Sequence, residues 1–424
     1  MKTTKFFFMA ALALMTAACS NDDNDLTQQP AKAEGIPFTA TISMGESAST
    51  RALTENGTKI EATWAVDDKV ALIHNGVKDE MTVSAVNAGV ATITGTITGS
   101  PSGGDAVTII YPSDAADGTT GNVKSDWLST QDGTLKGTSG TSIEEKYDVR
   151  KGSGALNASG TSLDGTVSLT NQNAIFKLTL KDIDGTNDVS ATSVVISDQT
   201  GVVTTVTPAS GYENAMYVAL PTTATTLKFL VTGSDSKKYF NMASSLSLGA
   251  NYYQSTVKLA TVGDVILSTG KCAKAGTGSP VAMIAYLGNG SDCTNGLAIQ
   301  LNTSPVEKNW NDAKTYASDL TAVPGGTWRL PSKADWQNMF VGCAKSGDAI
   351  SPDGDGKMDP IAGFREKIGA TGITWQSDAY WSSTGSGSYA WNVDVALSVS
   401  YAYARFKEHV TTSLPCRVRA CLVF

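Results

Sequence analysis

The sequence predicts a mostly β chain in which two tandem β-sandwich domains precede an α+β domain. Of the 424 residues, 17% are charged and 41 are glycines, a composition that disfavours coiled coils and helical bundles. As far as about residue 260, short apolar runs alternate with polar residues and are separated by turn signals. Helical spacing first appears beyond Gly263, where five of the six cysteines also lie.

Charge and histidine content exclude several classes of protein. The net charge is −8 and no basic run occurs, so nucleic-acid binding is not expected. Only His74 and His409 are present, which excludes multi-histidine metal sites and leaves little basis for a histidine-dependent catalytic triad. We therefore expect no enzymatic activity, no metal and no cofactor.

The N-terminus has the pattern of an export signal. Lys2 and Lys5 precede the apolar run Phe6–Ala18, whose 13 residues are fewer than the roughly 20 that span a bilayer as a helix. Residues 1–18 are thus expected to be a signal peptide. Thr16-Ala17-Ala18-Cys19 resembles a bacterial lipobox, which implies cleavage before Cys19 and attachment of lipid, including palmitate. The alternative is an ordinary secretory signal followed by a chance cysteine.

Residues 19–35 are expected to form a lipidated acidic tether. The acidic run Ser20–Asp25 resembles the surface-export signal of Bacteroidetes lipoproteins. That resemblance implies a lipid-anchored, surface-exposed protein of the outer membrane. The alternative is a solvated tether without a signal.

Residues 36–160 are predicted to form the first β-sandwich. Lys69–Gly76 is a strand that runs into an Asn-Gly turn, and Ala91–Thr98 alternates strictly, with threonines on one face. Ala106–Tyr111 is a short buried run closed by Pro112. A Gly/Ser/Thr-rich stretch at 137–165 then leads to the next domain.

Residues 161–260 are predicted to form the second β-sandwich. Phe176, Leu178 and Leu180 alternate with polar residues, as in a strand with one wet face. The runs Ala215–Pro221 and Leu227–Val231 follow between turn signals, and this pattern of short strands is typical of sandwiches.

These two segments resemble the fimbrillin-like subunits of Bacteroidetes type V pili. The resemblance is carried by Thr50-Arg51-Ala52, Thr63–Val70, Tyr111-Pro112 and Gln131-Asp132-Gly133. It implies that an arginine-specific protease trims the first domain at Arg51 and that other pilus subunits bind by strand addition to the sheet. The alternative is that Arg51 lies in a flexible lead-in that proteases nick without consequence.

Residues 262–424 are predicted to form a mixed α+β domain. Trp310, Ala313, Ala317 and Leu320 share a helical face, and Ser332 begins a second helix with capping-box spacing to Asp335. We expect a third helix from Asp359-Pro360 to Gly369 and strands at 389–397, 400–406 and 415–423. In the second helix the predicted core stripe consists of Trp336, Met339, Phe340 and Cys343.

This order of elements resembles a C-type-lectin-like domain of the Fibrobacter major-paralogous type. The residues that carry the resemblance are Trp328–Ser332, Tyr380–Thr384 and Arg417–Ala420, and we expect Trp328, Trp336 and Trp381 to be core. Trp310-Asn311-Asp312 repeats a calcium-binding triplet of animal lectins, but here it opens a helix. Asp353–Asp359 fails the EF-hand pattern, because Lys357 and Met358 occupy positions 5 and 6. An Asp-Gly turn is therefore expected there, with an adventitious calcium site as the alternative.

The region after the Tyr-Trp-Ser-Ser turn is the predicted ligand-binding site. In C-type-lectin-like folds this region usually meets ligands, and aromatic and arginine side chains are frequent at binding hot spots. The alternative is that any of these residues fills the sheet core. The candidate residues are Tyr389, Trp391, Asn392, Asp394, Tyr401, Tyr403, Arg405 and Lys407.

The cysteines indicate an oxidising compartment without fixing a pairing. A disulfide from Cys343 to Cys416 or Cys421 would be reasonable. The alternative is that all five cysteines beyond Cys19 are small buried apolar residues; the other two are Cys272 and Cys293.

Together these patterns predict a surface lipoprotein adhesin, the tip subunit of a type V pilus, that binds a glycan or protein ligand. The alternatives are an anchored binding lipoprotein or ancillary pilin that never polymerises, and an enzyme of the formylglycine-generating type. Enzymes of that type carry an arginine-glycine-glycine motif, and this sequence lacks it.

Overall fold

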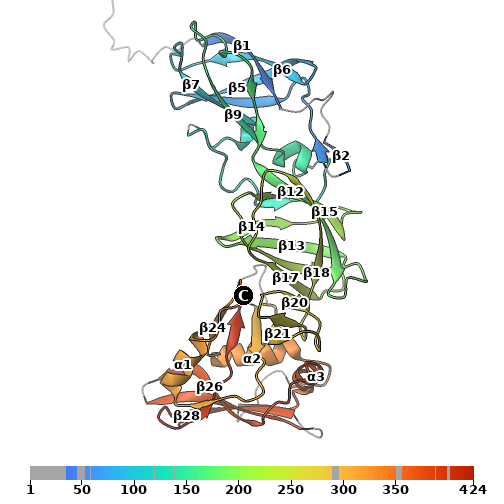
Figure 1. Ribbon diagram of the computed structural model, residues 1–424, viewed down its shortest axis with the longest axis vertical. Helices are drawn as coiled ribbons and strands as arrows, with labels where there is room; N and C mark the ends of the chain where they lie inside the picture. The colour runs from blue at the N-terminus through green and yellow to red at the C-terminus, as the bar shows by residue number, and fades with distance from the viewer. Residues whose placement is uncertain are drawn as a thin grey trace, which may run out of the picture.

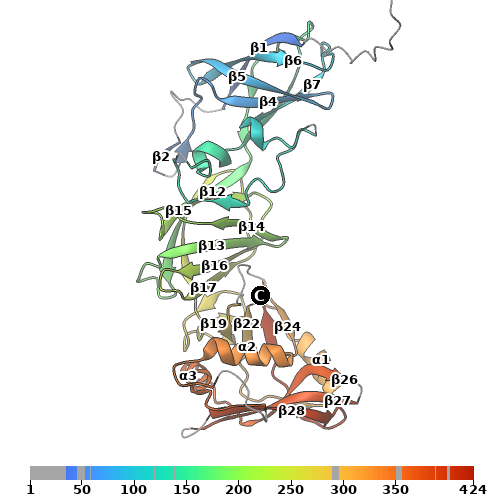
Figure 2. The same ribbon diagram turned by 180° about the vertical axis from the view of Figure 1, so that it is seen from behind.

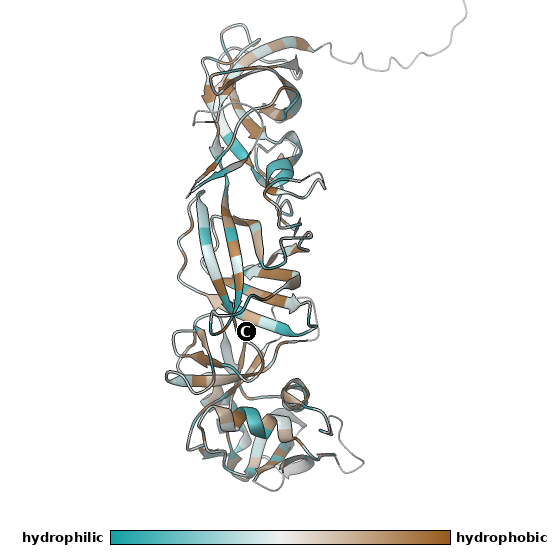
Figure 3. Ribbon diagram, turned by 90° about the vertical axis from the view of Figure 1, so that its right-hand side faces the viewer, coloured by the Kyte–Doolittle hydropathy of each residue, from teal (hydrophilic) through white to brown (hydrophobic). Residues whose placement is uncertain are grey.

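The computed structural model describes residues 35–44, 53–57, 59–118, 120–137, 139–288, 296–349, 356–386, 388–398 and 402–424. The chain is mostly β and forms an elongated stack of three units (Figures 1 and 2). Along the strands, hydrophobic and hydrophilic segments alternate, as expected for sheets with one buried face (Figure 3).

The first unit is an eight-stranded sheet with a large core on one side and a smaller cluster, which contains Ala71, Ile73 and Ile110, on the other. Trp64 lies in the large core with its ring 5.2 Å from that of Tyr111, at an interplanar angle of 76°. Asn75 and Gly76 both have positive φ, as the predicted Asn-Gly turn requires. In sheet order the strands are β10 (Val167–Ser168), β1 (Ile36–Ser43), β6 (Val90–Ile97), β5 (Val77–Asn87), β4 (Lys69–His74), β7 (Ala106–Tyr111), β9 (Arg150–Ala155) and β11 (Thr170–Asn171).

The middle unit consists of two facing sheets. The smaller has the order β15 (Ala215–Pro221), β12 (Asn173–Asp182) and β18 (Tyr252–Leu259). The larger has the order β17 (Lys238–Ala243), β16 (Leu227–Gly233), β13 (Ala191–Asp198), β14 (Gly201–Val206) and β8 (Thr130–Gln131). As predicted, Leu178 and Leu180 face the core between the sheets.

The chain passes between these two units more than once, not only near residue 160. The first sheet takes strands as late as Asn171, whereas β8 belongs to the middle unit although it precedes β9. Gln131 of β8 is buried, and its amide accepts a hydrogen bond from the Ala219 backbone N–H at 2.8 Å and donates to the Ala219 carbonyl at 2.8 Å. A small hairpin, β2 (Thr54–Asn56) and β3 (Lys59–Glu61), pairs only with itself in the described part of the chain.

The third unit has two six-stranded sheets and three helices. The first sheet has the order β20 (Cys272–Ala273), β19 (Val265–Leu267), β21 (Pro280–Tyr286), β22 (Leu297–Gln300), β30 (Cys421–Val423) and β24 (Thr327–Arg329). The second has the order β23 (Glu307–Lys308), β29 (Cys416–Arg417), β26 (Asp378–Ser386), β27 (Tyr389–Leu397), β28 (Ala402–Thr411) and β25 (Lys357–Met358). The helices are α1 (Trp310–Ser318), α2 (Lys333–Cys343) and α3 (Ala362–Ala370).

The helix predictions hold, with shifts of boundary: α1 ends at Ser318, so Leu320 lies beyond it, and the third helix begins later than predicted. The Ser332–Asp335 capping box is present at α2, and the predicted stripe on this helix is buried. Trp328, Trp336 and Trp381 are also buried, as expected for core residues. The third helix begins at Ala362 rather than at Asp359-Pro360, because the backbone at Ile361 is still non-helical.

The predicted last strand, 415–423, is in fact two strands in different sheets. β29 pairs with β23 and β26, whereas β30 pairs with β22 and β24. Val418, Arg419 and Ala420 lie buried between them, where the chain crosses from one sheet to the other. This crossing joins the two sheets of the third unit around a common interior.

The third unit also shares a core with the middle unit. Phe240 of β17 and Phe424 have ring centroids 4.4 Å apart, and both residues are buried. Lys238 Nζ also donates to the Gly288 carbonyl at 2.8 Å. The sheet of β26, β27 and β28 lies at the opposite end of the third unit and forms the end of the stack (Figure 1).

Candidate functional site

Several predicted sites fall outside the described residues. They are the lipidation site Cys19, the processing site Arg51, the ligand candidate Tyr401, the cysteine Cys293 and the loop 350–355. The other ligand candidates lie on β27 and β28.

Over residues 402–407, strand β28 directs alternate side chains to two opposite faces. Ala402, Ala404 and Phe406 are buried in the core beneath α2 and α3, because they alternate with the outward-facing residues of the strand. Tyr403, Arg405 and Lys407 point away from that core, and Arg405 and Lys407 are exposed.

The neighbouring strands extend this polar surface. Arg405 lies directly opposite Lys357 of β25 on one side and Asp394 of β27 on the other. Asn392 of β27 lies opposite Lys407. Directly opposed residues have Cβ atoms about 5 Å apart, so their side chains can act on one ligand. We call this surface the outer face; it consists of Lys357, Asp394, Tyr403, Arg405 and Lys407.

The charges of the outer face are mostly paired. Lys407 Nζ lies 3.2 Å from Asp394, and Lys357 Nζ lies 2.6 Å from Asp359 and 5.0 Å from the centre of the Tyr403 ring. The Arg405 guanidinium forms no hydrogen bond or ion pair within the part of the chain that the structure describes. It is therefore the group on this surface that is available to a ligand.

Two predicted residues are not available in the same way. Trp391 packs against the core that also contains Val393, and Lys333 Nζ lies 3.5 Å above its ring centre. This placement agrees with the core-filling alternative and separates Trp391 from the outer face. Asn392 is 5% exposed, and its Nδ2 donates to Cys416 Sγ at 3.7 Å.

Tyr389 belongs to a second surface at the β26–β27 hairpin. Tyr389 is 48% exposed and pairs with Thr411 of β28. Leu414, three residues after Thr411, is 55% exposed. Trp310 adjoins this surface, since its backbone N–H donates to the Thr412 carbonyl at 3.0 Å. We call Trp310, Tyr389 and Leu414 the hairpin corner.

The sequence patterns do not single out Leu414 or Lys357 as surface residues, whereas Trp310 is half-buried on the helical face that it is predicted to share with Ala313 and Ala317. The tryptophan was correctly placed at the start of a helix, but a helix-start signal does not reveal which side chains gather beside it. Lys357 was considered only as part of a possible calcium loop. Its pairing with β28 depends on a register that no local pattern specifies.

At the other end of the molecule, β1 has the features of a replaceable strand. It pairs with β6 along all eight of its residues but with β10 at only two positions. Phe38, Ala40, Ile42 and Met44 point inward and are buried. Its inward side chains therefore fill the first core, while its other edge is only partly paired. Besides the two β10 positions, the Thr39 N–H donates to the Thr161 carbonyl at 3.2 Å and the Leu169 N–H donates to the Ser43 carbonyl at 2.7 Å.

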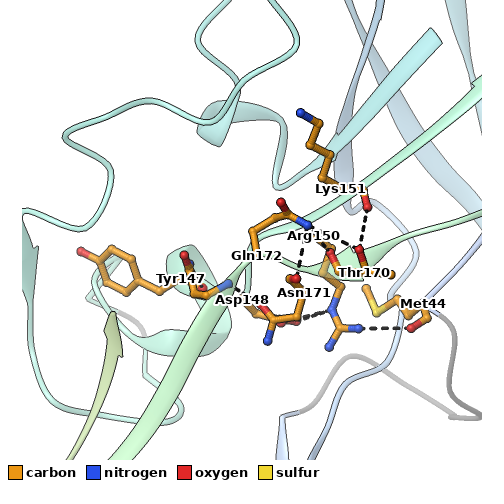
Figure 4. Close-up of polar contacts among 9 residues, drawn as sticks. Met44, Tyr147, Asp148, Arg150, Lys151, Thr170, Asn171 and Gln172 are labelled. Carbon is orange, nitrogen blue, oxygen red and sulfur yellow. Dashed lines mark hydrogen bonds and ion pairs between the residues drawn. The ribbon is translucent and has the colours of Figure 1, made fainter. Parts of the chain in front are cut away.

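A partly buried arginine contacts the backbone at the end of β1. Arg150 Nη1 donates to the Met44 carbonyl at 3.2 Å, while its Nε lies 3.1 Å from Asp148 (Figure 4). After residues 45–52, the Leu53 backbone N–H donates to Glu144 Oε1 at 2.9 Å. The segment that carries Arg51 is thus held on both sides by separate contacts.

Glu55, four residues beyond Arg51, fastens the β2–β3 hairpin to the middle unit. Its carboxylate receives hydrogen bonds from Lys177 Nζ at 2.8 Å, Tyr217 OH at 2.5 Å, Tyr252 OH at 2.7 Å and Gln254 Nε2 at 3.1 Å. The Lys177 hydrogen bond, followed by the two tyrosine bonds, lowers the pKa of Glu55 to about 2. We call this arrangement the Glu55 clamp.

Four cysteines lie in the described ranges, and none of them forms a disulfide there. Cys272, Cys343, Cys416 and Cys421 are free thiols, so the suggested link from Cys343 to Cys416 or Cys421 is not present. Cys343 and Cys421 are fully buried, whereas Cys272 and Cys416 are only half-buried, so the alternative of buried apolar cysteines holds for two of the four described residues. Within the described ranges, no cluster of three or more His, Cys, Asp or Glu residues could hold a metal ion, and no helix is long and apolar enough to cross a membrane.

No protein-family model and no curated protein matches the chain. Among solved structures, it resembles a "putative cell adhesion protein" of Bacteroides ovatus at 12% identity and TM-score 0.33, covering 54% of this chain and 95% of that one. It also resembles a fimbrial protein of Bacteroides ovatus at 12% identity and TM-score 0.25, covering 92% and 100%. A fimbrial assembly protein of Parabacteroides distasonis gives 13% identity and TM-score 0.29, covering 52% and 90%. At this level of similarity, function has to be argued from the residues of this chain.

Proposed function

We propose that this chain is a lipid-anchored adhesin of the outer-membrane surface that forms the tip subunit of a type V pilus. In this proposal Cys19 carries the lipid, the first two units receive a neighbouring subunit, and the C-type-lectin-like third unit binds a glycan or protein ligand through its outer face. The similar solved structures named above are described as fimbrial or cell adhesion proteins.

The observation that carries the proposal is an asymmetry between two strands. β1 could be replaced by another strand, because one of its edges is only partly paired and it is flanked by the segment that carries Arg51. Phe38, Ile42 and Met44 are buried, and each contributes about 1.5–3 kcal/mol by leaving water. Loss of β1 would expose a groove in the first core that only another apolar strand could refill.

β30 has the opposite character. It lies between β22 and β24, hydrogen-bonded on both sides, and Phe424 is packed against Phe240 of the middle unit. A strand paired on both edges cannot leave without breaking two ladders and this aromatic contact. The arrangement therefore favours a subunit that accepts a strand and does not donate its own last strand, which is the role of a tip.

The position of the outer face supports the same role. It lies at the end of the stack, remote from the first unit that would accept the neighbouring subunit (Figure 1). A ligand bound there would leave the assembly end of the molecule unobstructed.

The proposal is tested by trimming and capture. The purified chain is treated with an arginine-specific protease, and its capture of pilus subunits is compared with that of the Arg51→Ala variant. We expect cleavage after Arg51 and capture only by the trimmed wild-type chain. Equal capture by the variant would contradict strand exchange at β1. Ligand binding without any capture would favour the non-polymerising lipoprotein instead.

A further inference from the structure

The outer face of the third unit differs in charge from the rest of the chain. Acidic residues outnumber Lys and Arg by 40 to 32 in the whole sequence. On the outer face, Lys357, Arg405 and Lys407 stand against the single carboxylate of Asp394, with Asp359 beside Lys357. A local excess of positive charge on an acidic protein attracts anionic ligands and disfavours non-specific ones.

Arg405 is the centre of this surface. Lys357 and Asp394 lie directly opposite it on the two neighbouring strands, and Tyr403 and Lys407 precede and follow it on the same face of β28. Both flanking lysines have ion-pair partners, whereas no described residue pairs with the Arg405 guanidinium. A guanidinium presents a planar fork of N–H donors that matches carboxylate and sulfate oxygens.

The surface lacks what a protein partner would need. Protein interfaces are centred on a fully buried apolar patch with aromatic anchors. Among its described residues the outer face offers one aromatic side chain, Tyr403, and otherwise only charged groups. Asp394 adds an acceptor for hydroxyl groups, so donors and an acceptor lie beside one flat ring. This combination suits a carbohydrate that carries acidic groups.

We propose that the outer face binds an acidic polysaccharide, with Arg405 holding a carboxylate or sulfate group between Lys357 and Lys407. This inference rests on the adhesin function proposed above and specifies the class of its ligand. Tyr403 supplies the surface on which a sugar ring lies, and Asp394 limits affinity by repelling the acidic groups while accepting hydroxyl hydrogen bonds. Trp391, on the other side of the sheet, takes no part.

Binding of the purified full chain is measured against three oligosaccharides of equal length. A heparin-derived fragment carries sulfates, an oligogalacturonate carries carboxylates only, and a dextran is neutral. Comparison of the first two probes shows whether the face prefers sulfate or carboxylate groups. We expect both acidic probes to bind more tightly than dextran and to weaken as salt rises. Arg405→Gln should reduce affinity about tenfold, because it removes a charge-assisted bidentate contact.

The sign of the Asp394 effect separates binding from a merely structural role. Asp394→Asn should raise affinity for the acidic probes several-fold, whereas damage to the fold would lower it. Lys237→Gln is the matched control, since this lysine is 68% exposed on the middle unit and also pairs with an aspartate. It should leave affinity unchanged.

Three results would overturn the inference. Equal binding of dextran, tighter binding of a polyglutamate peptide than of either acidic sugar, or an Arg405→Gln variant that binds like wild type would exclude an acidic polysaccharide at this face. The capture of pilus subunits after trimming at Arg51 is measured separately. Failure of the ligand class and failure of the proposed tip role are therefore distinguishable.

Discussion

The Glu55 clamp should hold the β2–β3 hairpin on the middle unit, and Glu55→Gln should loosen it. This substitution keeps the shape of the side chain but removes its charge and its ability to accept four hydrogen bonds as a carboxylate. The hairpin pairs with no other strand in the described part of the chain, so side-chain contacts have to hold it in place. Its local stability should respond directly to the loss.

The magnitude follows from the pKa and the exposure of the pair. Lowering the pKa of Glu55 from 4.5 to about 2 would correspond to roughly 3 kcal/mol for a desolvated group, at about 1.4 kcal/mol per unit. The Glu55 and Lys177 side chains are 25% and 35% exposed, so solvent screens part of this energy. We expect about 1–2 kcal/mol, or roughly a tenfold change in the local opening equilibrium.

Amide hydrogen exchange across residues 53–61 measures that equilibrium directly. Exchange in the Glu55→Gln variant should be about tenfold faster than in wild type. Glu61→Gln is the matched control on the same hairpin, because Glu61 accepts one exposed hydrogen bond from Asn56 at 3.0 Å. We expect it to change exchange by less than about threefold, since exposed pairs contribute little.

The pH dependence of the exchange difference tests whether the charge of Glu55 holds the hairpin. Because the pKa of Glu55 is depressed in the folded state, its contribution is fully present above about pH 4.5 and is lost as the pH falls through about 2. After correction for intrinsic exchange, the difference between variant and wild type should shrink over this interval. A difference that is absent at pH 7, or that persists unchanged at pH 2, would show that the clamp does not hold the hairpin by charge.

Three further predictions concern the junctions and the core. Phe240→Ala should destabilise the contact between the middle and third units by about 3–4 kcal/mol, because it leaves a cavity beside Phe424, and small-angle scattering should show a broader range of shapes. Gln131→Ala should lower the free energy of unfolding by about 2–4 kcal/mol, as measured by urea denaturation, since it leaves the buried backbone N–H and carbonyl of Ala219 unpaired. Burial raises the pKa of Cys343 and Cys421 to about 12, so iodoacetamide at pH 8 should modify neither thiol until urea unfolds the chain, as mass spectrometry would detect.

Much of the secondary structure could be predicted because its signals are local. The Ser332–Asp335 capping box lies within one turn of helix, and the alternation at 91–98 lies within one strand. The Asn75-Gly76 turn is equally local, since it depends only on the φ angles that those two residues tolerate. In each case the residues that decide the structure are the ones that form it.

The candidate site was predicted less well, for a physical reason. Alternation shows that Trp391 and Tyr403 each lie on one face of a strand, but it does not show which face another element covers. A register shift between Ala390 and Asn392 alters the alignment of β27 with β28 further. Tyr403 consequently lies on the outer face and Trp391 against the core.

The sequence by itself determined the positions of most strands and helices and the change from all-β to α+β after residue 260. The tertiary structure alone decided that β30 is an interior strand, that Glu55 meets Tyr252 across 197 positions, and that Arg405 stands between Lys357 and Asp394. The reason is the range of the forces involved. Caps, turns and alternation act between near neighbours in the chain, whereas these three arrangements arise only when packing brings distant segments into contact.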